Sequence, residues 1–84
     1  MNKLDSLKKK ILYRANYRGT KEMDILLTKF VQKHIDTLDI DQLNELDKFL
    51  DFEDETIYNF YQFDRISQSI DKNKISKIFK KFKI

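Results

Sequence analysis

Hydrophobic positions along the chain recur with the period of α-helices rather than that of β-strands. Apolar residues spaced three or four positions apart occur in five segments, at residues 3–16, 20–37, 40–51, 55–62 and 72–82. No run alternates between apolar and polar residues for long, and no Asn-Gly or Asp-Gly pair marks a hairpin. The pattern therefore predicts an all-α fold, a single compact bundle of five short helices with the second at its centre.

Each segment has an apolar face that predicts its part of the core. These faces consist of Leu4, Leu7, Ile11 and Ala15; Met23, Leu26, Leu27, Phe30, Val31, His34 and Leu38; Leu43, Leu46, Phe49 and Leu50; Ile57, Tyr58, Phe60 and Tyr61; and Ile75, Ile78, Phe79 and Phe82. The chain contains no proline and a single glycine, Gly19, so helix caps must separate the segments. The predicted N-caps are Thr20, Asp39 with its capping-box partner Gln42, Asp54, and Asp71. Residues 63–70 have no clear assignment.

Composition limits the class of protein. Eighty-four residues with 40% hydrophobic content predict one domain, residues 1–84, with a modest core. There is no cysteine, which fits a reducing compartment, and no apolar run approaches the roughly 20 residues of a membrane span. Many Lys, Ile and Asn residues and no recognisable presequence lead us to expect a bacterial cytoplasm, with a mitochondrial matrix as the less favoured location.

The charges are unevenly distributed although the net charge is only +3. Basic ends, at residues 1–18 and 72–84, flank an acidic middle at 36–56. The C-terminal end reads as a basic amphipathic helix, which could lie on nucleic acid or an anionic membrane. More often the apolar side of such a helix packs on the bundle. Because an acidic middle would repel phosphate, we expect no nucleic-acid partner.

Residues for catalysis or metal binding are sparse. The only histidine, His34, lies on the apolar face of its segment, where a packed or half-buried role is expected. Asp39 and Asp41 lack the glycine and glutamate of a calcium loop, and no phosphate-binding glycine motif occurs. The sequence therefore predicts a protein that is not an enzyme and binds no metal.

The glycine-containing corner is the most distinctive stretch. Arg18, Glu22 and Asp24 lie within seven residues around a sharp turn at Gly19, in the sequence NYRGTKEMD. Side chains at a corner are expected to project outward, and an arginine with nearby carboxylates suits recognition of another protein's polar groups. The alternative is a plain helix-turn-helix joint, in which Gly19 turns, Thr20 caps and the charges are solvated.

The corner resembles the RGxxE motif of the succinate dehydrogenase flavinylation factor family, extended to RGxxExD by Asp24. The resemblance covers about residues 8–62. It continues through an acidic cap at 36–39, the apolar pair Phe49 and Leu50, and an acidic cap that opens a short aromatic helix at 54–60. The family fold is a five-helix bundle. Departures from the family pattern occur at Tyr17, Thr20, Ile35 and Phe60.

The resemblance implies a function. Family members assist covalent attachment of FAD to the flavoprotein subunit of succinate dehydrogenase, and in some bacteria of fumarate reductase. A client histidine attacks the flavin's methyl carbon, and the small protein acts as an assembly chaperone. By this resemblance Arg18, Gly19 and Glu22 form a docking loop with Asp24 beside it, flanked by Tyr17 and Lys21. No cofactor would be stably bound, and a monomer is expected.

Two other functions stay open at this point. One is a small basic nucleic-acid binder that uses the lysine-rich ends. The other is a general interaction protein with an antitoxin-like role, which would bind a partner other than a flavoprotein.

Overall fold

Helices make up all the regular secondary structure of residues 3–83, the part of the chain that the computed structural model describes. They are α1 (Lys3–Asn16), α2 (Lys21–His34), α3 (Ile40–Phe49), α4 (Asp54–Phe63), the 3-10 turn η1 (Ile70–Lys72) and α5 (Ser76–Lys81). The prediction of an all-α bundle with five helices is confirmed. No helix within these residues is long and apolar enough to cross a membrane.

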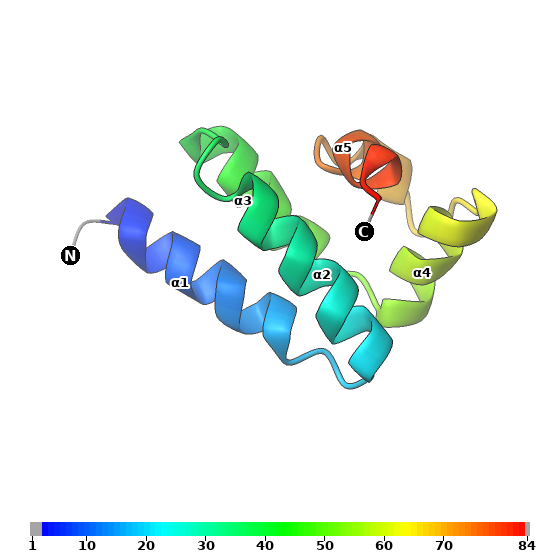
Figure 1. The fold of residues 1–84 in the computed structure, drawn as a ribbon. Helices are drawn as coiled ribbons and strands as arrows, with labels where there is room; N and C mark the ends of the chain where they lie inside the picture. Colours follow the sequence, from blue (N-terminus) through cyan, green and yellow to red (C-terminus); the bar gives the residue numbers. More distant parts are fainter. Residues whose placement is uncertain (1–2, 84) are drawn as a thin grey trace.

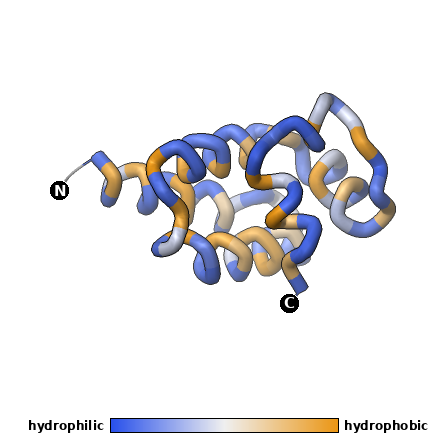
Figure 2. The backbone as a smooth tube through the Cα atoms, turned by 90° about the horizontal axis from the view of Figure 1, so that it is seen from above, coloured by the Kyte–Doolittle hydropathy of each residue, from blue (hydrophilic) through white to orange (hydrophobic). Residues whose placement is uncertain are grey.

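The helices are arranged around α2. Helices α1 and α2 form an antiparallel hairpin, joined by a tight corner at residues 17–20, and α3 packs beside α1 (Figure 1). Helices α4 and α5, with η1, lie on the other side of the hairpin (Figure 1). Apolar and polar stretches alternate along every helix, as an amphipathic bundle requires (Figure 2). The corner between α1 and α2 therefore faces the start of α4.

Three fully buried phenylalanines join the bundle at its centre. The Phe79 ring lies 5.1 Å from the rings of both Phe30 and Phe49, so α5, α2 and α3 meet there. Phe82 adds an edge contact at 5.3 Å to Phe30. Because α5 has only 6 residues, these aromatic contacts stabilise it more than its own hydrogen bonds do. The apolar side of the basic C-terminal segment thus packs on the bundle.

Ion pairs join α1 to α3 and to Asp51, which lies just beyond its end. Arg14 donates to the carboxylate of Asp47 at 2.7 Å and also pairs with Asp51, while Lys10 lies 3.0 Å from Asp47. Burial of the Asp47 carboxylate would raise its pKa, but the hydrogen bonds from Lys10 and Arg14 outweigh burial and lower it. The acidic middle of the sequence therefore neutralises part of the basic N-terminal helix.

The predicted caps hold for two helices and are wrong for two. Thr20 accepts from the backbone of Met23, and Asp39 forms the expected capping box with Gln42. Asp54 does not cap α4, because it is the first helical residue and its carboxylate binds another partner; Glu53 is the N-cap and makes no side-chain bond.

The last predicted helix, 72–82, is divided. Asp71 lies in η1 and caps nothing, and α5 begins only at Ser76. The cause is Asn73, whose side-chain oxygen accepts from the backbone of Ile75 at 2.8 Å while its amide donates to the carbonyl of Glu45 at 3.0 Å. An asparagine that bonds to the backbone two residues on favours a turn over a helix. The second helix also ends at His34, earlier than the predicted 37.

The unassigned stretch after α4 is an irregular turn. Asp64, Gln68 and Ser69 all have left-handed backbone angles, with φ of 55°, 55° and 59°. The ammonium group of Lys80, on α5, caps the C-terminal end of α4 by donating to the carbonyls of Phe60 and Tyr61 at 2.7 and 2.9 Å. One of the C-terminal lysines is therefore a structural group.

Candidate functional site

The corner between α1 and α2 is closed by its own backbone and side chains. Gly19 has φ of +117°, a conformation that favours glycine, and the hydroxyl of Thr20 accepts from the N–H of Met23 at 3.3 Å. The carboxylate of Asp24 accepts from the backbone N–H of Arg18 at 2.6 Å. Asp24 therefore reaches back from the first turn of α2 and fixes the end of the corner, instead of projecting outward.

Arg18 reaches inward to the connection between α3 and α4. Its Nε donates to Asp54 at 2.8 Å, and its two terminal nitrogens donate to the carbonyls of Leu50, at the end of α3, and Phe52, the latter at 2.6 Å. The side chain is only 11% exposed. The expectation that Arg18 projects outward is wrong, because the unpaired carbonyls after α3 and the carboxylate of Asp54 attract its guanidinium. We call these contacts the Arg18 brace.

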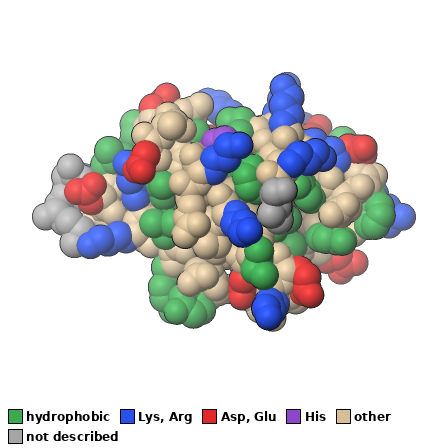
Figure 3. All heavy atoms as spheres, in the orientation of Figure 1, with side chains coloured by type: hydrophobic (Ala, Val, Ile, Leu, Met, Phe, Trp, Pro, Cys, Tyr) green, Lys and Arg blue, Asp and Glu red, His purple; other side chains and the backbone are tan. Residues whose placement is uncertain are grey.

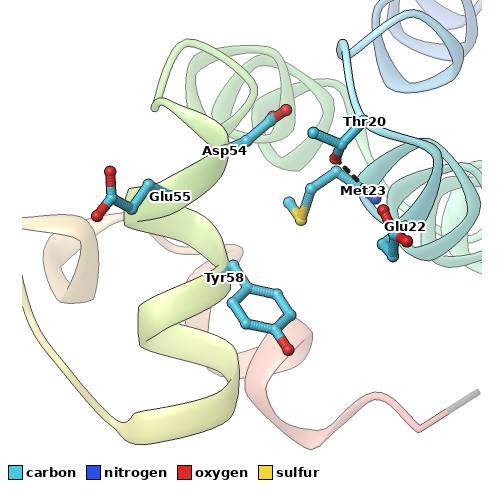
Figure 4. Close-up of a pocket in the computed structure, with 6 residues that line it drawn as sticks. All are labelled: Thr20, Glu22, Met23, Asp54, Glu55 and Tyr58. Atoms are coloured by element: carbon cyan, nitrogen blue, oxygen red, sulfur yellow. Dashed lines mark hydrogen bonds between the residues drawn. The ribbon is translucent and has the colours of Figure 1, made fainter.

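The brace places the start of α4 against the corner and creates an open groove. The corner groove, as we call it, has a volume of about 500 Å³ and is lined by Thr20, Glu22, Met23, Asp54, Glu55 and Tyr58. In Figure 4 the Met23 sulfur lies between α2 and α4, and the labelled carboxylates of Glu22 and Glu55 lie toward opposite sides. Three of the lining residues are acidic, and Glu55 turns its carboxylate away from Met23 and Tyr58 to the far side of α4 (Figure 4).

The six predicted site residues fall into two groups. Arg18 and Asp24 hold the corner together, as described above. Gly19, Lys21, Glu22 and Tyr17 are exposed, and Glu22 alone of the six lines the corner groove. Tyr17 is 67% exposed, and the centre of its ring lies 4.6 Å from the centre of the Tyr13 ring on α1.

Hydrophobic side chains also project from the lower edge of the molecule, beneath α1, in Figure 3.

Five groove residues were not predicted as site residues: Thr20 and Met23, which were expected as a helix cap and a core residue, and three residues of α4. Asp54, Glu55 and Tyr58 are separated from the corner by about 30 residues of sequence, and the folded brace brings them beside it. The acidic opening of a short aromatic helix was the one sequence signal that marked this stretch. It did not show that the helix lies next to the corner.

His34 packs among aromatic rings of the core. The His34 ring is half-buried, 4.7 Å from Phe30 and 6.2 Å from Phe82, as expected for a packed histidine. Burial, with the charge of Lys33, lowers its pKa below the ordinary value. Within residues 3–83 no group of three or more His, Cys, Asp or Glu could hold a metal ion.

The fold and the site define a small all-α protein whose glycine corner is braced from within and borders an acidic groove. The chain belongs to the family described as flavinator of succinate dehydrogenase, whose model matches residues 9–83. No solved structure matches it.

Similar proteins come from fungi and bacteria. The chain is 41% identical over 54 residues to succinate dehydrogenase assembly factor 2, mitochondrial, of Meyerozyma guilliermondii, a match that covers 64% of this chain and 40% of the relative. It is 34% identical over 55 residues to the protein of the same name in Lodderomyces elongisporus, covering 66% and 34%. It is 35% identical over 51 residues to FAD assembly factor SdhE of Acetobacter pasteurianus, covering 61% and 47%. The chain thus spans less than half the length of these relatives.

These names correct the expected location. We expected a bacterial cytoplasm, but relatives at 41% and 34% identity are named as mitochondrial assembly factors, which points to the mitochondrion instead. The lysine, isoleucine and asparagine content that led to the bacterial expectation does not distinguish the two compartments.

Proposed function

We propose that this chain is a monomeric assembly factor that promotes covalent attachment of FAD to the flavoprotein subunit of succinate dehydrogenase. Membership of the flavinator family and the names of the relatives support this proposal. The observation that carries it is the Arg18 brace, which holds the corner rigid while Lys21 and Glu22 stay exposed. A rigid, exposed corner suits docking on another protein because little conformational entropy is lost on binding.

The bond-forming chemistry would belong to the client. The methyl group of the client's FAD would lose a proton, a client histidine nitrogen would bond to that carbon, and the flavin ring would take up the electron pair of the broken C–H bond. This chain would position the reacting groups without acting as an enzyme. We propose that it binds no FAD stably. Glu22, Asp54 and Glu55 are among the residues that line the corner groove, and this acidic surface would repel the diphosphate of FAD. The chain would therefore recognise the flavoprotein rather than its cofactor.

The corner residues would have different roles in docking. Glu22 would contact the client directly, with Lys21 and Tyr17 at the edges of the contact. Gly19 would allow close approach, since a Cβ placed there would meet no atom within 4 Å and the space beside it is open to a partner. Arg18 and Asp24 would act as positioning residues, through the brace and through the bond from Asp24 to the Arg18 backbone.

The test uses the flavoprotein subunit of succinate dehydrogenase from the same source, purified without cofactor. It is incubated with FAD in the presence and absence of this chain, and flavin fluorescence of the client band is read on a denaturing gel. We expect faster and fuller covalent labelling when the chain is present. If a client shown to be competent for labelling is labelled equally with and without the chain, the proposal is overturned. The same assay with the fumarate reductase flavoprotein tests a second client.

A further inference from the structure

The outer sides of α2 and α5 carry lysines and no acidic side chain. No Asp or Glu occurs over residues 25–34 or over residues 72–83. Five exposed lysines of these stretches form what we call the basic face: Lys29, Lys33, Lys77, Lys81 and Lys83. The first two are four residues apart in α2, and the next two are four residues apart in α5, so each pair lies on one side of its helix.

Aromatic packing brings these two groups of lysines to one face of the molecule. The centre of the Phe82 ring lies 5.3 Å from the centre of the Phe30 ring on α2, and the ammonium of Lys33 lies 5.5 Å from the same Phe82 ring. The ammonium of Lys83 lies 5.7 Å from the centre of the Tyr61 ring. Figure 3 shows Lys and Arg side chains gathered over α5 and the adjoining part of α2. Segments far apart in the sequence thus supply one positive surface.

The charge of the basic face is not neutralised within residues 3–83, where none of its lysines forms an ion pair or a side-chain hydrogen bond. Of the acids that border these stretches, Asp24 accepts from the backbone of Arg18. Asp36 pairs with Lys8, which leaves Asp71 as the one bordering acid without an ion pair in the described part of the chain. The face therefore keeps a net positive charge that acts on molecules approaching from outside.

The chemistry of the basic face favours an acidic protein surface over lipid or nucleic acid. Lysine ammoniums are strongly hydrated point charges on flexible stems, suited to diffuse attraction. Phe79 is fully buried and Phe82 is 7% exposed, so α5 has no large apolar side chain left to insert into a bilayer. The face also has no arginine and no exposed aromatic ring, the groups that stack on the bases of nucleic acid.

The position of the basic face points to the same partner as the corner. Glu22, Lys29 and Lys33 are spaced by seven and then four residues, which returns all three to one side of α2. The two lysines lie about 10 and 16 Å from Glu22 along the axis, at 1.5 Å per residue. A specific interface covers about 800 Å² of each protein, a patch roughly 30 Å across. A partner docked on the corner would therefore reach the basic face as well.

We propose that the basic face is a second contact for the flavoprotein client, which binds an acidic region of that protein and steers it onto the corner. The inference rests on the proposed function for the identity of the partner. Complementary charge accelerates encounter and fixes orientation more than it strengthens the final complex. The corner would supply the specific contact, and the basic face would speed and align its formation.

The test measures association and dissociation rates of the full chain with the cofactor-free flavoprotein subunit, at about 50 and about 300 mM NaCl. One triple variant removes charge from the basic face at three lysines that have no side-chain partner within residues 3–83: Lys29→Gln, Lys77→Gln and Lys81→Gln. A matched triple variant removes the same charge from exposed positions of α1 and α3: Lys3→Gln, Lys9→Gln and Lys48→Gln. Circular dichroism checks that both variants are folded.

We expect the basic-face variant to associate about tenfold more slowly at the lower salt concentration, with a weaker salt dependence and a dissociation rate within about twofold of wild type. The matched variant should associate within about twofold of wild type. An unchanged association rate in the basic-face variant, or an equal loss in both variants, would overturn the proposal.

Two further results separate this proposal from the proposed function. If the wild type stimulates covalent FAD labelling and the basic-face variant associates with the client at the wild-type rate, the basic face is not a client contact and the assembly function stands. If the wild type neither binds the client nor stimulates labelling, both proposals fail. Binding to vesicles of phosphatidylcholine and phosphatidylserine that is lost in the basic-face variant, with client association unchanged, would assign the face to a membrane and overturn the proposal.

Discussion

Replacing Arg18 by alanine should destabilise the whole bundle, although the residue belongs to an exposed corner. The change removes three side-chain hydrogen bonds, to Asp54 and to the carbonyls of Leu50 and Phe52. It leaves two carbonyls at the end of α3 without a donor and the carboxylate of Asp54 without a cation. The start of α4 then loses its link to the corner.

The size of the effect follows from this geometry. Hydrogen bonds to charged groups contribute about 1.5–3 kcal/mol each, and breaking a buried ion pair costs about 3–5 kcal/mol. The Arg18 side chain is 11% exposed and Asp54 is 23% exposed, so water can satisfy part of what is lost. We therefore expect the free energy of unfolding to fall by about 3 kcal/mol. For a domain of this size that corresponds to a drop in Tm of about 12–24 °C.

Urea unfolding followed by circular dichroism at 222 nm measures this difference. The matched control is Arg65→Ala, since Arg65 is exposed and its guanidinium lies 5.6 Å from the centre of the Phe63 ring. Its loss should cost about 0.5 kcal/mol. If Arg18→Ala were as stable as this control, the brace would be a surface contact of no structural importance, and the inward role assigned to Arg18 would be refuted.

Three further predictions concern stability. Gly19→Ala should cost about 1–2 kcal/mol of unfolding free energy, because φ of +117° strains any residue with a Cβ; a thermal melt at the wild-type Tm would contradict this. Asp47 has a lowered pKa in the folded state, so its pairing with Lys10 and Arg14 stabilises the fold above the unfolded pKa near 4. This stabilisation is lost as the pH falls through the folded pKa. The free energy of unfolding should therefore differ less between pH 7 and pH 3 in Asp47→Asn than in the wild type. Asp39→Ala removes the capping box of α3 and should cost about 1 kcal/mol in urea unfolding, and no change would show that the box is solvated.

Local rules in the sequence were sufficient for most of the fold. Helical periodicity placed α1 and α3 well because their apolar residues recur regularly and polar caps or a glycine limit them. The last segment failed because periodicity continued through Asn73, while the bond from Asn73 to Glu45 depends on a residue 28 positions away. Tertiary contacts of that kind leave no local mark in a sequence.

The candidate site was predicted only in part for a similar reason. The motif identified the corner, and Gly19 has the backbone angle that its position required. Nothing local indicated that Arg18 would turn inward, because its partners lie at Leu50, Phe52 and Asp54. The groove itself is a product of that long-range brace. A motif can therefore mark a structural corner in the sequence without giving the direction of each of its side chains.

The most direct test of the account compares wild type and Glu22→Gln in covalent FAD incorporation into the cofactor-free flavoprotein subunit, with urea unfolding measured on the same samples. Glu22 is exposed and forms no bond that holds the bundle within residues 3–83. The account predicts an initial labelling rate at least fivefold lower, with an unfolding free energy within about 0.5 kcal/mol of wild type. Full labelling activity in a folded Glu22→Gln protein would contradict it, and the corner would then be only a well-braced turn.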